Sequence, residues 1–203
     1  MVFIASMKKD NIDNIFTEEN FEKKIINFSF TVGEAKKLRR TGWKREAKIM
    51  LAETIAEHMY RVTILAMVVS DIRKLDTEKV IKMSLLHDLS EVLTGDLTPV
   101  DRERLGIEET LQKERKALEK ILNNFPKKIK ENYLNIWSEN QKLETDEARL
   151  VNSIDKLEMA IQAIEYIRDG YDENNLRKFI ISAEKSIKDP QILGMLKNLK
   201  FYH

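Results

Sequence analysis

Cysteine is absent from this chain of 203 residues, and glycine and proline are scarce, with 6 and 3 residues. The lack of cysteine excludes disulfides, zinc sites with thiolate ligands and thiol nucleophiles. Because glycine and proline leave few breaks, long helices are favoured over a β architecture with many turns. The chain also lacks the run of about 20 apolar residues that a transmembrane helix needs, and its start lacks the basic segment of a signal peptide. We therefore expect a cytoplasmic protein without a membrane partner.

An excess of charge of one sign is lacking too, since 35 Lys and Arg residues nearly cancel 34 Asp and Glu residues. This balance argues against a nucleic-acid polymer as the partner. Hydrophobic residues make up 42% of the chain, which is enough for a folded core. We find no linker and no internal repeat, so we expect one domain over residues 31–203. An N-terminal extension, residues 1–30, is expected to be polar and irregular, with one short helix from Thr17.

Apolar residues at helical spacing predict an all-α bundle. Gly42 is expected to close the first helix of the domain, and Asp76 to cap the start of the third. The third helix is expected to run on to Thr94, just before Gly95. The predicted helices cover residues 31–41, 52–70, 77–94, 108–123, 126–140, 146–169 and 173–186.

Two of the three histidines, His58 and His87, lie on apolar faces of neighbouring predicted helices. A single inward histidine is most often an ordinary, hydrogen-bonded core residue. Here, however, Asp88 directly follows His87, and Glu91 lies one turn further on. A buried cluster of acids is costly unless a positive group compensates it. Two inward histidines with these acids therefore favour a functional site.

The spacing of these residues suits a bound cation. Residues 87 and 88 diverge by about 100° around a helix, so His87 and Asp88 can reach one ion from two directions. His58 would add a third ligand from the neighbouring helix. Asp155 is the best candidate for a fourth, because this acid interrupts an apolar line; alone, it would be interpreted as an exposed or capping residue. Two imidazole nitrogens and two carboxylates suit one divalent ion such as Mn, Fe, Co, Ni or Zn.

Several longer motifs resemble those of a known family. AETIAEHMYR at 52–61 and KMSLLHDLSEVLTGDLTP at 82–99 resemble the HD-domain phosphohydrolases, and more narrowly their 5′-deoxynucleotidase branch. RTGW at 40–43 and IDKLEMAIQA at 154–163 agree with the same branch. The resemblance covers residues 38–166 and implies an HD-domain helical bundle that often works as a homodimer. The metal ligands that it implies are His58, His87, Asp88 and Asp155.

The resemblance also implies roles in catalysis and substrate binding. Glu91 matches the acid beside the attacking water, and Asp96 matches a second active-site acid. Trp43 matches an aromatic residue that packs against the sugar and disfavours a 2′-hydroxyl, although it could equally be a buried anchor. Bacterial members have an arginine just before this tryptophan, whereas this chain has Gly42. Two arginines are therefore candidates for the phosphate ligand, Arg40 and Arg45.

The implied reaction converts deoxyribonucleoside 5′-monophosphates to deoxynucleosides and phosphate by direct attack of water. A binuclear phosphodiesterase would need more histidines, and the only spare one is the terminal His203. A guanosine-tetraphosphate hydrolase is a closer alternative, but that group resembles His-Asp followed by Glu-Asp, where this chain has HDLSEV. A noncatalytic helical module with a structural metal is a third possibility, against which the presence of Glu91 and Asp96 argues.

Overall fold

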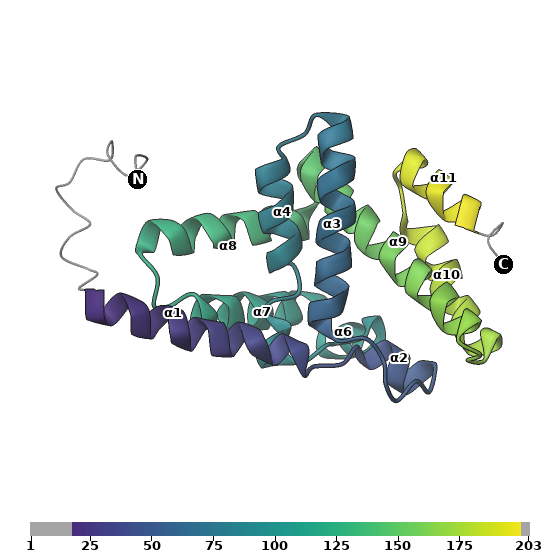
Figure 1. The fold of residues 1–203 in the computed structure, drawn as a ribbon, viewed down its shortest axis with the longest axis horizontal. Coiled ribbons are helices and arrows are strands. Elements are labelled where there is room, and N and C mark those ends of the chain that lie inside the picture. The colour runs from purple at the N-terminus through teal and green to yellow at the C-terminus, as the bar shows by residue number, and fades with distance from the viewer. Residues whose placement is uncertain (1–17, 200–203) are drawn as a thin grey trace.

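The computed structural model describes residues 18–199, and their regular structure is helical (Figure 1). In this range the only β pairing is an isolated antiparallel bridge between Arg39 and Thr54. The all-α fold predicted from the sequence is thus confirmed. The helices are α1 (Glu18–Gly33), the 3-10 helix η1 (Glu34–Lys36), α2 (Thr41–Glu46), α3 (Ile55–Arg73), α4 (Thr77–Leu86), α5 (Glu91–Thr94), α6 (Pro99–Leu105), α7 (Ile107–Ile121), α8 (Lys127–Lys142), α9 (Asp146–Arg168), α10 (Glu173–Ser186) and α11 (Pro190–Leu199).

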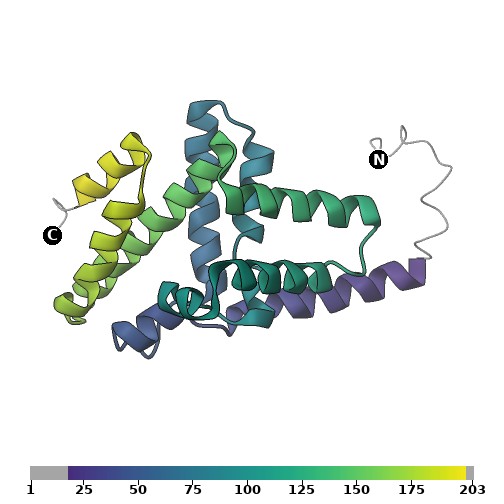
Figure 2. The ribbon, with the colours of Figure 1, turned by 180° about the vertical axis from the view of Figure 1, so that it is seen from behind.

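Helix α9 organises the bundle, because it packs against α3, α4, α8, α10 and α11. Helices α3 and α4 stand side by side near the middle of the molecule, and α10 and α11 flank α9 at the C-terminal end (Figures 1 and 2). The main core draws side chains from seven helices, among them Val62, Met83, Leu118, Ile154 and Ile192, which are fully buried. This core fixes the helices that carry the candidate site.

Side-chain caps place the starts of the helices. Thr54 accepts a hydrogen bond from the backbone of Glu57, whose side chain bonds back to Thr54, so that α3 begins with a capping box. Asp76 caps α4 as predicted, because its carboxylate accepts from the backbone N–H of Lys79. Thr98 and Asp101 form a second capping box, with Pro99 in the first turn of α6.

The continuous helix expected over residues 77–94 is wrong. Helix α4 ends at Leu86, residues 87–90 form turns, and α5 begins at Glu91. The backbone N–H of Leu89 bonds to the carbonyl of Leu86, three residues back, and that of Glu91 bonds to Asp88 in the same way. Aspartate and serine favour such turns because their side chains compete for nearby backbone groups. His87 and Asp88 therefore lie on a turn at the end of α4.

Two further boundaries differ from those predicted. Gly42 does not close a helix, since α1 ends at Gly33 and Gly42 lies inside α2. The helix expected from Thr17 is present but longer than predicted, because α1 begins at Glu18, has 16 residues and covers all of residues 18–30, the rest of which was expected to be irregular. Phe28 on this helix packs edge-on against Phe125, with ring centroids 4.9 Å apart. Helix α1 runs through residue 30, where the expected extension ends, and residues 1–17 lie outside the described part of the chain. The helix expected over residues 31–41 is wrong, because α1 ends at Gly33 and only the short η1 follows before Thr41. Helices α2, α6 and α11 were not predicted.

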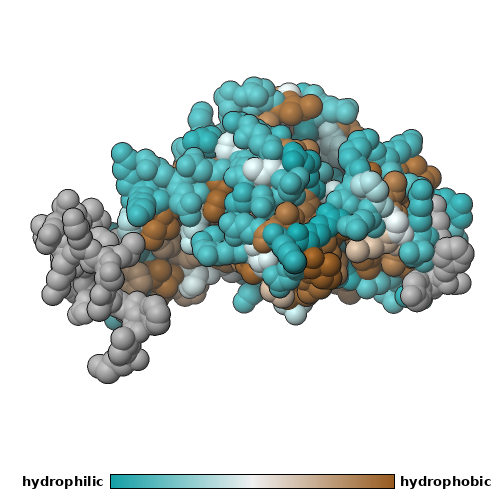
Figure 3. Space-filling model, turned by 90° about the horizontal axis from the view of Figure 1, so that it is seen from above, coloured by the Kyte–Doolittle hydropathy of each residue, from teal (hydrophilic) through white to brown (hydrophobic). Residues whose placement is uncertain are grey.

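The surface mixes polar side chains with apolar patches. Figure 3 shows one face that is mostly hydrophilic and has several exposed hydrophobic patches. Helix α3 carries an exposed row of apolar side chains at a spacing of four residues, namely Tyr60, Ile64, Val68 and Ile72. Across residues 18–199, none of the helices combines the length and hydropathy that a membrane span requires.

Candidate active site

Two buried histidines face each other where α3 meets the end of α4. His58 lies in the first turn of α3 and is fully buried, and His87 follows α4 directly and is 8% exposed. Their ring centroids lie 5.5 Å apart. The capping box of α3 and the turn after Leu86 bring together two residues that are 29 positions apart in the chain.

Hydrogen bonds define which nitrogen of each ring is available to a ligand. Nδ1 of His58 lies 2.6 Å from Oε2 of Glu158, and Nδ1 of His87 lies 2.7 Å from the backbone oxygen of Ser84. A carbonyl or carboxylate oxygen only accepts, so each Nδ1 carries the proton. Both Nε2 atoms are buried and have no hydrogen-bond partner among the described residues. In the neutral rings their lone pairs are therefore free.

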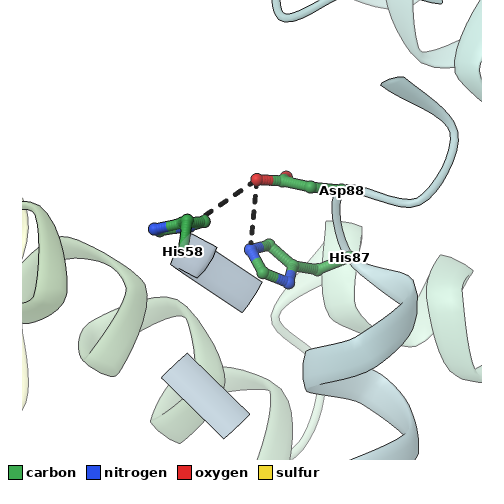
Figure 4. Close-up of side chains that lie close together, drawn as sticks. All are labelled: His58, His87 and Asp88. Carbon is green, nitrogen blue, oxygen red and sulfur yellow. Dashed lines mark ion pairs between the residues drawn. The ribbon is translucent and has the colours of Figure 1, made fainter. Parts of the chain in front are cut away.

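Two carboxylates lie next to these nitrogens. Oδ2 of Asp88 is 3.3 Å from Nε2 of His87 and 3.6 Å from Nε2 of His58 (Figure 4). From α9, Oδ1 of Asp155 approaches to 3.2 Å of Nε2 of His58. The four residues expected to be metal ligands thus lie together, and ligand atoms of His58, His87 and Asp88 all lie within 4.8 Å of one another.

The donor set fits a divalent cation. Burial and the charge of Arg40 oppose protonation of His58, yet the carboxylates of Asp155 and Glu158 raise its pKa to about 9. The surroundings of Nε2 of His58 therefore favour a positive charge. Imidazole nitrogens together with carboxylate oxygens are ligands that Mn, Fe, Co, Ni and Zn accept.

Glu91 lies beside this group at the start of α5 and is 3% exposed. Its Oε2 has no hydrogen-bond partner among the described residues, and its Oε1 is 3.7 Å from a guanidinium nitrogen of Arg102. Burial, with the charges of Asp88 and Asp96, raises the pKa of Glu91 well above its usual value. A buried carboxyl group with a free oxygen is suited to taking and giving a proton.

Arg40 is the arginine that reaches the candidate site. Its Nη1 lies 2.9 Å from Oδ2 of Asp88 and 3.6 Å from Oδ1 of Asp96. Burial opposes the positive charge of Arg40, but Asp88 and Asp96 outweigh this effect and raise its pKa. Asp96 also accepts a hydrogen bond from the backbone N–H of Thr41, at the first residue of α2. Asp96 thereby holds both Arg40 and the start of α2 next to the segment that follows α5.

Arg45 points elsewhere. Its guanidinium forms a two-point ion pair with Asp101, at 2.6 and 3.2 Å, and its side chain is 53% exposed. Asp101 belongs to the capping box of α6, so this pair ties α2 to α6. Of the two arginines expected near the phosphate, the structure brings Arg40 to the site and leaves Arg45 outside it.

Trp43 is both anchored and close to the site. Its indole is 2% exposed, lies 4.2 Å from the ring of Phe179 between centroids, and donates from Nε1 to Oε1 of Glu53 at 2.9 Å. Tyr166 packs edge-on against it. The sequence left open whether Trp43 is a buried anchor or packs against a sugar. The geometry makes it an anchor, and Trp43 also lines the neighbouring pocket.

A pocket of about 370 Å³ opens over these residues. Its lining includes Arg40, Trp43, His87, Asp88, Glu91, Asp96 and Asp155. On α9, Asn152, Asp155 and Met159 are spaced to share one helix face and line the pocket along that helix. Trp43 and Phe179 add aromatic surface, while Arg40 and Lys156 add positive charge. The volume falls in the range of small-molecule sites.

Comparisons with known proteins identify the family of the chain. A family model described as HD domain matches residues 32–192. The chain belongs to the HD-domain family. The family resemblance inferred from the motifs is thereby confirmed.

Named relatives align with most of this HD-domain chain. A protein of Danio rerio named 5′-deoxynucleotidase HDDC2 is 33% identical over 175 residues, which cover 86% of each chain. Its namesake in Dictyostelium discoideum is 34% identical and covers 86% of this chain and 96% of the relative. A solved structure of a conserved hypothetical protein from Pyrococcus furiosus is 27% identical, covers 86% of this chain and 98% of its own, and has a TM-score of 0.70.

The HD-domain site also contains residues that the sequence interpretation missed. Glu53, His58 and Glu158 form a second buried group with ligand atoms close together. Both carboxylates already accept hydrogen bonds, Glu53 from Trp43 and Glu158 from Arg61. In this group the nitrogen of His58 is Nδ1, which carries a proton toward Glu158 and so cannot ligate a second cation. The sequence did contain a signal for Glu158. Like Asp155, it is an acid at an apolar position of its helix, four residues after the buried Ile154.

Proposed function

We propose that this chain is a metal-dependent 5′-deoxynucleotidase, which hydrolyses deoxyribonucleoside 5′-monophosphates to deoxynucleosides and phosphate. The observation that carries the proposal is the pair of free, buried Nε2 atoms of His58 and His87, which lie with Asp88 and Asp155 at a pocket of small-molecule size. Relatives that cover most of the chain bear the name 5′-deoxynucleotidase, which supports the same activity.

One divalent cation per chain would be held by His58, His87, Asp88 and Asp155. When bound, such a cation supplies Lewis-acid chemistry, since it stabilises charge on a phosphoryl group and lowers the pKa of water. Mn, Fe, Co, Ni and Zn all suit the nitrogen and oxygen ligands. The buried position of both histidines supports a site that keeps its geometry between turnovers.

The remaining residues of the pocket divide the other tasks. Arg40 lies beside Asp88 and presents its guanidinium to the pocket, where it would bind the phosphate through charge-assisted hydrogen bonds. Glu91 has a free oxygen and a raised pKa, which suit a group that takes a proton from the attacking water. Asp96 would act as the second acid of the site and hold Arg40 and the start of α2 in place. No covalent intermediate is needed.

Trp43 and Phe179 would form the wall against the sugar. The two rings lie 4.2 Å apart between centroids, and Glu53 fixes the indole, so this wall is rigid. A rigid wall excludes an extra hydroxyl more strongly than a deformable apolar pocket does. This supports a preference for deoxyribonucleotides over ribonucleotides.

We also infer a homodimer, supported by the exposed apolar row Tyr60, Ile64, Val68 and Ile72 on α3. Light scattering of the purified chain tests this inference, and a mass of one chain would contradict it. The cytoplasmic location stays a prediction.

A phosphate-release screen tests the proposed activity. The four deoxyribonucleoside 5′-monophosphates, their ribose counterparts and guanosine tetraphosphate are each offered to chelated protein, with and without one added cation. We expect release from the deoxyribonucleotides that depends on the cation, and slower release from the ribonucleotides. Hydrolysis of guanosine tetraphosphate alone would instead support the alternative hydrolase, and no hydrolysis of any substrate would support the noncatalytic module.

A further inference from the structure

Glu158 and His58 form a hydrogen bond between two side chains that are both fully buried. Oε2 of Glu158 lies 2.6 Å from Nδ1 of His58. Glu158 comes from α9, one helical turn after Asp155, whereas His58 comes from α3. The bond thus crosses the interface between the two helices that bring these two candidate ligands together.

The other oxygen of Glu158 is also held. Nε and Nη2 of Arg61 lie 3.0 and 2.9 Å from Oε1 of Glu158. Arg61 stands three residues after His58 on α3 and also binds both oxygens of Glu165, at 2.7 and 2.8 Å. Since both oxygens of Glu158 are engaged, its carboxylate is not free to turn away from the imidazole of His58.

This arrangement determines whether Nε2 of His58 can act as a ligand. With its proton on Nδ1, the ring directs the lone pair of Nε2 toward Asp88 and Asp155, at 3.6 and 3.2 Å. If the proton moved to Nε2, the ring would present a donor to those carboxylates and could not ligate a cation. Carboxylates bonded to the outer nitrogen of a ligating histidine orient the ring and increase its basicity.

We propose that Glu158 is a positioning residue of the metal centre, which keeps the Nδ1 proton of His58 in place, and that Arg61 holds Glu158 in that position. Glu158 acts through His58 and does not line the pocket. The inference rests on the cation site of the proposed function, but not on the identity of the substrate.

Cation binding to the full chain provides the test. Zn²⁺ is titrated into chelated parent, Glu158→Gln and Glu165→Gln proteins. Glu165 is the matched control, because it lies on the same helix and binds the same Arg61 but does not contact His58. We expect the dissociation constant for Zn²⁺ to rise roughly 10- to 100-fold in Glu158→Gln and to stay near the parent value in Glu165→Gln.

A spectroscopic readout separates positioning from a general loss of structure. In the Zn²⁺-loaded parent, the Nδ1 proton of His58 should resonate far downfield in the proton NMR spectrum, because it is bonded to a carboxylate. Glu158→Gln should move this resonance upfield, whereas Glu165→Gln should leave it in place. The chain has three histidines, so the assignment needs few variants.

Arg61→Met is the second variant, in case Glu158→Gln fails to fold. Arg61 is partly exposed, and its loss should weaken Zn²⁺ binding by a smaller factor. If folded variants bind Zn²⁺ as tightly as the parent and keep the Nδ1 resonance, the inference is wrong while the proposed function stands. If the parent itself binds no Zn²⁺ or other divalent cation, the metal centre of the proposed function is wrong as well.

Discussion

Arg40 forms an ion pair with Asp88, with Nη1 2.9 Å from Oδ2, and this pair joins the start of α2 to the candidate metal ligands. In the proposed function, the guanidinium would therefore bind the phosphate of a substrate beside the cation. Arg45, five residues further on, is bound to Asp101 outside the pocket. The two arginines that the sequence could not distinguish thus have different surroundings.

Replacing these arginines in parallel tests the difference. Arg40→Gln should raise KM for a deoxyribonucleoside 5′-monophosphate about 10-fold or more, because a hydrogen bond between charged groups contributes roughly 1.5–3 kcal/mol. Arg45→Gln should leave KM near the parent value. Steady-state kinetics on both variants, with their cation content measured in parallel, show which arginine binds the phosphate. A larger effect from Arg45→Gln would reverse the assignment.

Glu91 is expected to transfer protons and not to bind the cation. Its free Oε2 and raised pKa suit it to this role. Glu91→Gln keeps the shape of the side chain but loses the exchangeable proton, so turnover should fall by on the order of 10²-fold or more. Elemental analysis should find the parent's cation content. Loss of cation and activity together would make Glu91 a ligand, and unchanged turnover would remove it from the mechanism.

Trp43 is expected to discriminate between sugars. Because the indole is also a packing anchor, Trp43→Phe is a better test than Trp43→Ala, which would remove most of a buried ring. The smaller ring should narrow the preference for deoxyribonucleotides, mainly through faster hydrolysis of the ribonucleotides. The ratio of kcat/KM for matched deoxy and ribo substrates measures this. An equal loss for both substrates would leave Trp43 with a packing role alone.

The sequence predicted the helices better than it predicted their ends. Residues 173–186 form α10 as expected, because apolar periodicity and a clear capping residue coincide there. The break after Leu86 was not foreseen, since the apolar pattern continues through Leu89 and Val92 while the backbone does not. Apolar periodicity indicates which side chains are buried. Because a tight turn between two helices can bury the same side chains as one continuous helix, the pattern does not distinguish the two.

The candidate site shows a similar limit. Order and type of residue were enough to select His58, His87, Asp88 and Asp155, because acids and histidines on apolar faces are unusual. The contact between Glu158 and His58 was not predictable, since it depends on how α9 crosses α3. Tertiary packing decides which of several buried acids meets a given histidine.

Acid should weaken the attachment of α11 through Asp189. The carboxylate binds the guanidinium of Arg73 at 2.5 and 2.9 Å and accepts from the backbone N–H of Gln191 and Ile192. The ion pair with Arg73 lowers the pKa of Asp189 in the folded protein. Its contribution, about 1 kcal/mol, should therefore be complete above the unfolded pKa of about 3.9 and be lost as the pH falls through the folded value.

Thermal unfolding of parent and Asp189→Asn across the pH range measures this contribution. The variant should have the lower Tm at pH 7, and the difference between the two proteins should shrink below about pH 4. A difference that stays constant down to pH 2 would show that the charge of Asp189 does not contribute.

The most direct test of the account is the cation requirement of the site itself. Parent, His87→Ala and Asp88→Ala proteins are stripped with a chelator, reloaded with Mn, Fe, Co, Ni or Zn, and assayed for bound metal and for phosphate release from a deoxyribonucleoside 5′-monophosphate. We predict one cation per chain in the parent, activity only after reloading, and loss of both in the two variants. A stripped parent that hydrolyses the substrate as fast as the reloaded one, or a reloaded parent without stoichiometric metal, would contradict the account.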